Sequence, residues 1–154
     1  MNLLFDTNII LTIARTKFPS KIIEYLNPED EQIYISVVNI AEAQCIAFQN
    51  GWGKAKMVAM EYFFNQVRAI EVTDILVPSY INIDAFSQCS HPEIAVYEHI
   101  TPRNMGKNDL WIAATASLLN LKLITTDADF DHLNTNFIEL QKVDTVEFKI
   151  FFES

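Results

Sequence analysis

The sequence predicts an α/β protein in which a mostly parallel central sheet lies between layers of helices. Short β-forming apolar segments alternate with segments of helical periodicity, and strands that helices separate favour parallel pairing. The 154 residues are 50% hydrophobic, which is enough for one well-packed core but too short a chain for two ordinary domains. We therefore expect a single domain over residues 1–154.

The first half of the chain contains two expected strands and two expected helices. The segment "NLLF" is β-forming and ends at Asp6, and "QIYIS" follows the short helical segment "IIEYL", which stops near Pro28. Ser36 is well placed to cap a helix through "VVNIAEAQCIAFQN", and Gly51 would end that helix.

The second half continues the alternation of helices and strands. A long amphipathic helix is expected from Lys54 to Arg68, then a brief strand "AIEV" and a helix that includes Ile75 and Phe86. After an irregular segment, "DLWIAATASLLN" has the clearest helical pattern of the chain, and "LKLITT" directly after it predicts a buried strand. The segments "FIEL" and "VEFKIFF" predict one or two further strands, the last from its alternating apolar residues.

Two acidic residues directly follow expected strands. Asp6 ends the first strand and Asp127 follows "LKLITT", and ligands of such sheets bind outside the carboxyl ends of the strands. Taken alone, Asp6 could equally form a turn or cap a helix. An ionised carboxylate within an apolar run is nevertheless unfavourable unless a partner compensates its charge.

Two more acidic residues lie on expected helices. Glu42 is flanked by Ala41 and Ala43, and the residues three and four positions away on its face are largely apolar, so a solvent-exposed glutamate is the less comfortable interpretation. Asp109 begins its helix, where the positive end of the helix dipole favours an acid. Because the apolar face of that helix continues from Asp109, we expect its side chain to point toward the core.

The spacing of Asp127, Asp129 and Asp131 invites comparison with a calcium-binding EF-hand loop. Such a loop needs glycine at its sixth position and glutamate at its twelfth, where this sequence has His132 and Ile138. We therefore reject a calcium loop and expect Asp129 and Asp131 to be a helix cap and a solvated surface acid.

The acids Asp6, Glu42, Asp109 and Asp127 can converge on one pocket at the carboxyl edge of the sheet. Their mutual repulsion would raise some of their pKa values and cost stability unless cations were bound. Carboxylate oxygens suit Mg²⁺ or Mn²⁺, and no Cys and His set is arranged for zinc. The sequence therefore predicts a metal site with these four residues as ligands.

Residues near these acids could support them or contact a substrate. Three candidates for hydrogen bonding to the metal ligands are Asn8, Ser36 and Thr126, although each could equally be an ordinary cap or strand-end hydroxyl. Three cations are candidate substrate contacts because they lie near the acids in sequence: Arg15, Arg103 and Lys107. For Trp52 and Lys54, a core aromatic and a solvated lysine are the better interpretations.

Composition limits the compartment and the way in which a nucleic acid could be bound. A net charge of -9 argues against binding through a broad positive field, but not against holding phosphate through metal ions. Cys45 and Cys89 are expected to be buried free thiols in a reducing cytoplasm. No apolar stretch could span a bilayer, and the N-terminal one is broken by Asp6 and Asn8, so we expect a cytoplasmic protein without membrane contact.

Four segments together resemble the PIN-domain ribonucleases, and most closely the VapC-type toxins of bacterial toxin–antitoxin pairs. They are "LLFDTNII", "SVVNIAEA", "NDLWIAATA" and "LITTDADF", which occur in that family's order over nearly the whole chain. The resemblance implies a compact PIN-like three-layer α/β/α sandwich and a Mg²⁺- or Mn²⁺-dependent endoribonuclease. The acidic quartet of the family matches Asp6, Glu42, Asp109 and Asp127. Homodimers and inhibition by a small antitoxin protein are common in the family, whereas the aromatic-rich middle "NGWGKAKMVAMEYFFNQ" departs from its pattern.

The implied reaction is hydrolysis of an RNA phosphodiester by a metal-activated water. Two alternatives remain at the level of sequence. One is a housekeeping PIN-like nuclease for RNA processing or repair, which an adjacent small reading frame encoding a DNA-binding antitoxin would argue against. The other is a non-catalytic nucleic-acid or protein binding module on the same fold, which the loss of one of the four acids would favour; all four are present.

Overall fold

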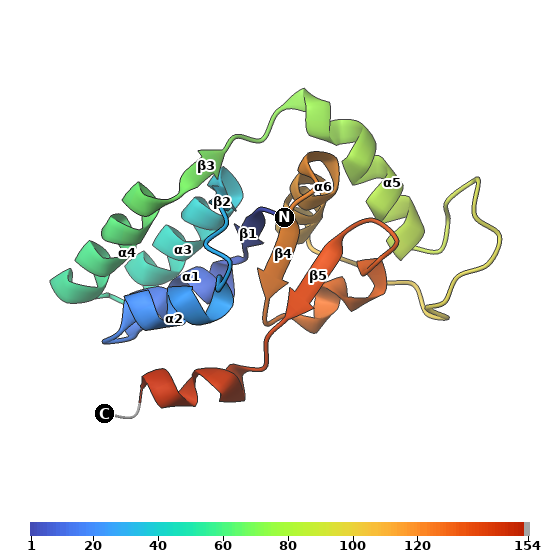
Figure 1. The fold of residues 1–154 in the computed structure, drawn as a ribbon. Coiled ribbons are helices and arrows are strands. Elements are labelled where there is room, and N and C mark those ends of the chain that lie inside the picture. The colour runs from blue at the N-terminus through green and yellow to red at the C-terminus, as the bar shows by residue number, and fades with distance from the viewer. Residues whose placement is uncertain (153–154) are drawn as a thin grey trace.

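A computed structural model describes residues 1–152 and contains a five-stranded parallel sheet with the strand order β3-β2-β1-β4-β5 (Figure 1). The strands are β1 (Leu3–Phe5), β2 (Ile33–Ser36), β3 (Arg68–Ile70), β4 (Lys122–Thr125) and β5 (Glu139–Lys142). The α-helices are α1 (Thr7–Arg15), α2 (Pro19–Leu26), α3 (Val37–Gln49), α4 (Lys54–Gln66), α5 (Val77–Ser87) and α6 (Lys107–Leu119). Three 3₁₀ helices complete the description of residues 1–152: η1 (Asp74–Leu76), η2 (Ala128–Leu133) and η3 (Thr145–Phe151).

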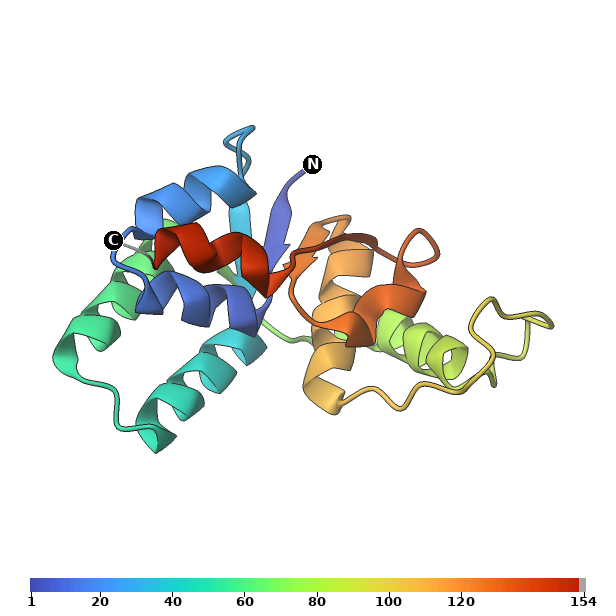
Figure 2. The same ribbon diagram turned by 90° about the horizontal axis from the view of Figure 1, so that it is seen from below.

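Alternate residues of each central strand pack against opposite layers of helices. In β1, Leu3 and Phe5 contact an apolar cluster formed with α1 to α4 and η3, whereas Leu4 contacts a second cluster formed with α5, α6 and η2. This alternation follows from the two-residue period of a strand, and it covers both faces of the sheet. Figure 2 shows the two helical layers on either side of the strands. The predicted three-layer α/β/α sandwich is confirmed.

Helix α3 begins and ends as its sequence predicts. The hydroxyl oxygen of Ser36 accepts a hydrogen bond from the Val38 amide at 3.1 Å, and the Asn39 side chain accepts one from the Ser36 amide at 2.8 Å. This reciprocal arrangement satisfies amides that the first helical turn would otherwise leave unpaired. Gly51 follows the helix with φ of +61°, a left-handed conformation that glycine adopts without strain.

The last predicted strand is wrong, because "VEFKIFF" forms the 3₁₀ helix η3. Asp144 caps this helix, with its carboxylate accepting from the Val146 amide at 3.0 Å. Phe148 and Phe151, three residues apart, are both buried against the first apolar cluster, whereas Val146 is exposed. A spacing of three places side chains on one face of a 3₁₀ helix, which the alternating pattern of the sequence concealed.

The irregular segment 88–106 between α5 and α6 is attached to the end of α5. Nε2 of His99 lies 3.0 Å from the carbonyl oxygen of Phe86, and the Arg103 amide donates to the carbonyl of Ser87 at 2.6 Å. The Ser87 hydroxyl also lies 2.7 Å from Nε2 of His132 in η2. These contacts join the end of α5 to η2 and to the segment that leads into α6.

The two cysteines are free thiols, as expected, but the prediction that they are buried is wrong for both. Cys45 is exposed on α3 and Cys89 is half-buried after α5. Among the helices in residues 1–152, none is long and apolar enough to cross a membrane.

The packing of η2 against the sheet generates a stability prediction. Phe130 is fully buried in the second cluster, so Phe130→Ala should lower the free energy of unfolding by about 3–5 kcal/mol through reduced burial and a residual cavity. Phe48 on α3 is 88% exposed, so Phe48→Ala should change it by less than about 0.5 kcal/mol. Urea unfolding followed by tryptophan fluorescence measures both, and equal effects of the two variants would contradict this packing.

Candidate active site

The predicted acids lie beside β1 and β4, the two neighbouring strands between which the order of strand addition changes side. From β1 the chain adds β2 and β3 on one side, and β4 and β5 are added on the other side. Asp6 directly follows β1, and Asp127 lies two residues beyond Thr125, the last residue of β4. Since connections leave β1 and β4 in opposite directions, a crevice can form between them, and it is the usual position of ligands in such sheets.

Asp6 is buried and held by two donors. Its side chain is the N-cap of α1 and accepts from the Thr7 amide at 2.8 Å, and its second oxygen accepts from the Thr125 hydroxyl at 2.6 Å. The residue is only 4% exposed, and burial is the largest influence on its carboxyl group, so that its pKa is raised despite these two hydrogen bonds. Asp6 is therefore both the cap of helix α1 and a member of the acidic cluster. The capping role that its sequence position suggested does not exclude a role in the site.

One threonine hydroxyl connects the acids after β1 and β4. The Thr125 hydroxyl donates to Asp6 and accepts from the Asp127 amide at 3.0 Å. Thr125 is fully buried, and its strand pairs directly with β1. The sequence prediction missed Thr125 and named its neighbour Thr126. Strand alternation, which turns adjacent side chains to opposite faces, was the available signal that only one of the two threonines can face Asp6.

Glu42 is positioned by a chain of hydrogen bonds from the start of two helices. Its carboxylate accepts from the Thr7 hydroxyl at 2.9 Å, and that hydroxyl accepts from the Asn39 side chain at 3.2 Å. Asn39 is fully buried, and its side-chain oxygen accepts from the Ser36 amide in the cap of α3. This cap thereby also orients Glu42, and the sequence prediction missed both Thr7 and Asn39.

The pKa of Asp109 is raised because the residue is partly buried and other acids lie near it. Partial burial and then repulsion by Asp6, Asp127, Glu42 and Asp129 raise this pKa from 3.8 to about 7. Within residues 1–152 the two ion pairs are Met1 with Glu31 and Lys142 with Asp131, so neither involves these five acids. Carboxylates from four different segments therefore share one site without an ion pair to a protein cation in the described part of the chain.

Asp129 is exposed, as expected of a surface acid, but it also belongs to this cluster, which the sequence prediction missed. Carboxylate oxygens of Asp109, Asp127 and Asp129 all lie within 4.8 Å of one another. The cap of η2 is Asp127, whose carboxylate accepts from the Asp129 amide at 2.9 Å. Asp131 is the surface acid, paired with Lys142 at 2.7 Å. The regular spacing of Asp127 and Asp129 was the available signal, although an EF-hand was the wrong interpretation of it.

The other predicted site residues have different positions. Ser36 acts on Glu42 only through Asn39, and in residues 1–152 the side chains of Asn8 and Thr126 form no hydrogen bond with any of the acids. Lys107 is the first residue of α6 and Arg103 precedes it, and both are exposed near the start of the helix that contains Asp109. Arg15 lies at the opposite end of α1 from Asp6 and is also exposed.

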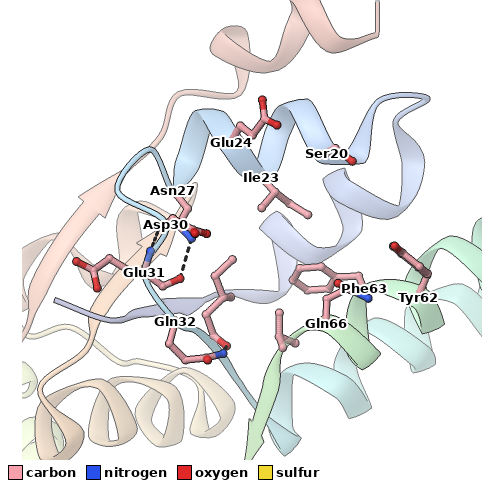
Figure 3. Close-up of a pocket in the computed structure, with 12 residues that line it drawn as sticks. Ser20, Ile23, Glu24, Asn27, Asp30, Glu31, Gln32, Tyr62, Phe63 and Gln66 are labelled. Atoms are coloured by element: carbon pink, nitrogen blue, oxygen red, sulfur yellow. Dashed lines mark hydrogen bonds between the residues drawn. The ribbon is translucent and has the colours of Figure 1, made fainter.

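The surface next to Glu42 is an open hollow of about 410 Å³, lined by Ala41, Glu42, Cys45, Ile46 and Asn108. Another pocket, of about 440 Å³, lies between α2, the start of β2 and the end of α4, and Figure 3 shows it with Tyr62 and Phe63 on one wall. Because this second pocket lies at the amino end of β2, it is at the wrong edge of the sheet for the acidic cluster. The hollow beside Glu42 is the one connected with the candidate site.

Comparisons with known proteins identify a family and a shared fold. The family model described as "PIN domain" matches residues 3–136. A comparison with curated protein sequences found no match.

Several solved structures share the fold at low sequence identity. A chain of the VapBC2 complex from Rickettsia felis bound to promoter DNA has a TM-score of 0.71 and 21% identity, covering 94% of this chain and 100% of that chain. VapBC-1 from nontypeable Haemophilus influenzae has a TM-score of 0.65 and 24% identity, covering 92% and 98%. VapC20 from Mycobacterium tuberculosis, a Sarcin-Ricin loop cleaving toxin, has a TM-score of 0.61 and 15% identity, covering 90% and 98%.

The raised pKa of Asp109 generates a prediction on pH. Between about pH 4 and about pH 7 the folded protein holds a proton on Asp109 that the unfolded chain has released, so stability should fall as pH rises through this window. Thermal unfolding in chelator should therefore show that wild type loses stability relative to Asp109→Asn as pH rises.

The difference between the two proteins is the informative quantity. The pKa of His132 is lowered to about 4 by burial and by His99, so this residue makes stability rise with pH between that value and 6.5, the opposite direction. Since both proteins contain His132, its contribution cancels. Parallel pH profiles of wild type and Asp109→Asn would show that the pKa of the Asp109 carboxyl is not raised.

Proposed function

This chain belongs to the PIN domain family, and we propose that it is a Mg²⁺- or Mn²⁺-dependent endoribonuclease that acts as the toxin of a toxin–antitoxin pair. The observation that supports this most strongly is the convergence of Asp109, Asp127 and Asp129, whose carboxylate oxygens lie within 4.8 Å of one another, with Asp6 and Glu42 near enough to help raise the pKa of Asp109. Within residues 1–152 no ion pair compensates these carboxylates. Such a cluster is unfavourable by itself and becomes favourable with a bound divalent cation.

The residues present fit a hard divalent cation. Asp109, Asp127 and Asp129 supply carboxylate oxygens within 4.8 Å of one another, and oxygen donors are what Mg²⁺ and Mn²⁺ prefer. Asp6 and Glu42 complete the acidic cluster, since both are close enough to help raise the pKa of Asp109 by charge repulsion. We propose Asp6, Glu42, Asp109 and Asp127 as the metal-binding and catalytic acids, with Asp129 as an additional ligand.

The residues of the chain have separate tasks in the proposed hydrolysis. A cation held by these acids would lower the pKa of a water bound to it and would provide positive charge near the scissile phosphate. Thr125 and the Thr7 amide hold the Asp6 carboxylate in a fixed position, and the Thr7 hydroxyl holds that of Glu42. These fixed carboxylates orient the attacking water, because carboxylate oxygens accept its hydrogen bonds. Arg103 and Lys107, exposed at the start of α6, are proposed to contact the phosphates that flank the cleaved bond.

The proposed toxin role implies a protein that inhibits the enzyme. We propose that a small antitoxin protein inhibits the enzyme by placing an arginine or lysine among the acids, since a guanidinium can replace the charge of the metal and bind carboxylates bidentately. A homodimer in the cytoplasm is the proposed state of the free enzyme. A bound antitoxin that left the acids accessible and the enzyme fully active would contradict this part of the proposal.

Metal binding can be tested separately from cleavage. Millimolar Mn²⁺ should raise the melting temperature of the wild-type protein, because a ligand of the folded state stabilises it by mass action. Asp129→Asn should reduce this increase, whereas Asp131→Asn, which removes an acid paired with Lys142 outside the cluster, should leave it unchanged. Differential scanning fluorimetry with and without Mn²⁺ measures it, and a melting temperature insensitive to Mn²⁺ would count heavily against the site.

Cleavage tests the function itself. Asp6→Asn and Asp109→Asn retain the size of each side chain but remove its charge, so each should abolish most RNA cleavage in Mn²⁺ because the cation is no longer held. In chelator, Asp109→Asn should unfold at the same temperature or higher, since a repelling charge is gone.

A purely structural role predicts the reverse outcome. If Asp6 served only as the cap of α1, asparagine would replace it at a cost of less than about 1 kcal/mol and without loss of activity. Asparagine variants that cleave total RNA at the wild-type rate would therefore refute the assignment of these residues.

A further inference from the structure

Two segments of this acidic protein contain basic residues but no acidic ones, and they pack together. Residues 7–23 and 43–60 contain five of the 11 Lys and Arg residues and none of the 20 Asp and Glu residues. The first segment includes α1 and the second includes the start of α4, and these two helices are in contact. The five cations are Arg15, Lys17, Lys21, Lys54 and Lys56, and all of them are exposed.

Trp52, in the connection between α3 and α4, holds two of these cations. Cζ of Arg15 lies 5.2 Å from the centre of the Trp52 ring, and Nζ of Lys56 lies 5.3 Å from it. The indole itself is half-buried and packs against the first apolar cluster, so it is the core aromatic that the sequence suggested rather than a free stacking platform. The ring therefore fixes two cationic groups at one place on the surface. We call Arg15 and Lys56, which lie against Trp52, together with Lys17 and Lys54, which are two residues from them along the chain, the basic patch.

The positions of these lysines do not serve helix stability. Lys54 and Lys56 lie in the first turn of α4, where the helix dipole disfavours positive charge, and Gly53 supplies no side-chain cap. Neither ion pair of residues 1–152 involves any residue of the basic patch. Arg15, in the last turn of α1, is placed favourably with respect to its own helix, but this accounts for one cation only.

The basic patch and the acidic cluster lie at opposite ends of one helix. Helix α1 starts directly after Asp6 and ends at Arg15, and nine residues at the helical rise span about 14 Å. A stacked strand advances by about 3.4 Å per nucleotide along its axis, so a stacked segment of roughly four nucleotides, or a shorter extended one, covers that distance. Figure 2 shows the connection between α3 and α4, which contains Trp52, beyond the end of α3 on the side away from the sheet.

We propose that the basic patch binds the phosphates of a single-stranded RNA segment a few nucleotides away from the scissile bond. This inference rests on the proposed ribonuclease function, since it assigns a second region of the protein to the same substrate. Fixed, exposed cations without acidic neighbours in sequence attract a polyanion, and in a protein of net charge -9 they define where its strand can lie. The site would then cleave RNA that extends past α1 in preference to very short oligonucleotides.

A matched pair of charge reversals tests the inference. Lys56→Glu alters the basic patch, and Arg68→Glu makes the same charge change at an exposed residue of β3, at the amino edge of the sheet. Binding of a fluorescent single-stranded RNA of roughly 12 nucleotides, followed by anisotropy in chelator, should weaken about tenfold in Lys56→Glu and less than about twofold in Arg68→Glu. The slope of log affinity against log salt should also fall by about 0.7 for each phosphate that the protein no longer neutralises, in Lys56→Glu alone.

Further variants and substrates separate the possible outcomes. Lys56→Gln should weaken binding in the same direction but less, and thermal unfolding identifies any variant that fails to fold. A dinucleotide, too short to reach from the acids to the patch even when extended, should bind weakly to wild type and to Lys56→Glu alike. Equal affinities of all proteins for the longer RNA, as expected if the patch instead binds a protein partner, would overturn the inference, and so would an equal weakening in Lys56→Glu and Arg68→Glu.

The wild-type protein separates this inference from the function on which it rests. If wild type cleaves the longer RNA in Mn²⁺ while the variants bind it equally well, only the basic-patch inference fails. If wild type neither binds nor cleaves RNA, the proposed function fails together with the inference.

Discussion

Repulsion among the carboxylates at the carboxyl ends of β1 and β4 is the constraint on which the rest of the site depends. Partial burial of Asp109, together with repulsion by Asp6, Glu42, Asp127 and Asp129, raises its pKa to about 7. A folded protein can keep such a cluster only if packing and hydrogen bonds elsewhere compensate for the repulsion. The two apolar clusters on the faces of the sheet provide that stability, and the acidic cluster in turn favours the binding of cations.

Neutral hydroxyl groups, rather than cations, hold the acids in place. Thr125 and Thr7 each join two segments of the site, because each hydroxyl donates to one carboxylate and accepts from another group. A lysine or arginine in their positions would compensate the charge of the carboxylates and would weaken the attraction of the cluster for cations. The threonines fix geometry while leaving the negative charge uncompensated, which is what a site for a divalent cation needs.

Negative and positive charge are also separated along helix α1. Helix α1 begins at the buried Asp6 and ends at Arg15, so the acidic cluster and the basic patch occupy its two ends. The three solved structures named above are at most 24% identical to this chain, so their surfaces need not resemble this one. The aromatic-rich segment around Trp52 provides the ring against which Arg15 and Lys56 lie.

The sequence by itself determined the layered α/β fold, the capped helix after Ser36 and the convergence of Asp6, Glu42, Asp109 and Asp127, since periodicity and strand ends are local properties of the chain. Tertiary structure alone decided that Asp129 joins the cluster while Asp131 pairs with Lys142, and that Thr125 rather than Thr126 contacts Asp6. It also decided that the last segment winds into η3, because burial of Phe148 and Phe151 against the first cluster outweighed its strand-like alternation. These outcomes depend on which segments meet in space, and neighbours along the chain do not contain that information.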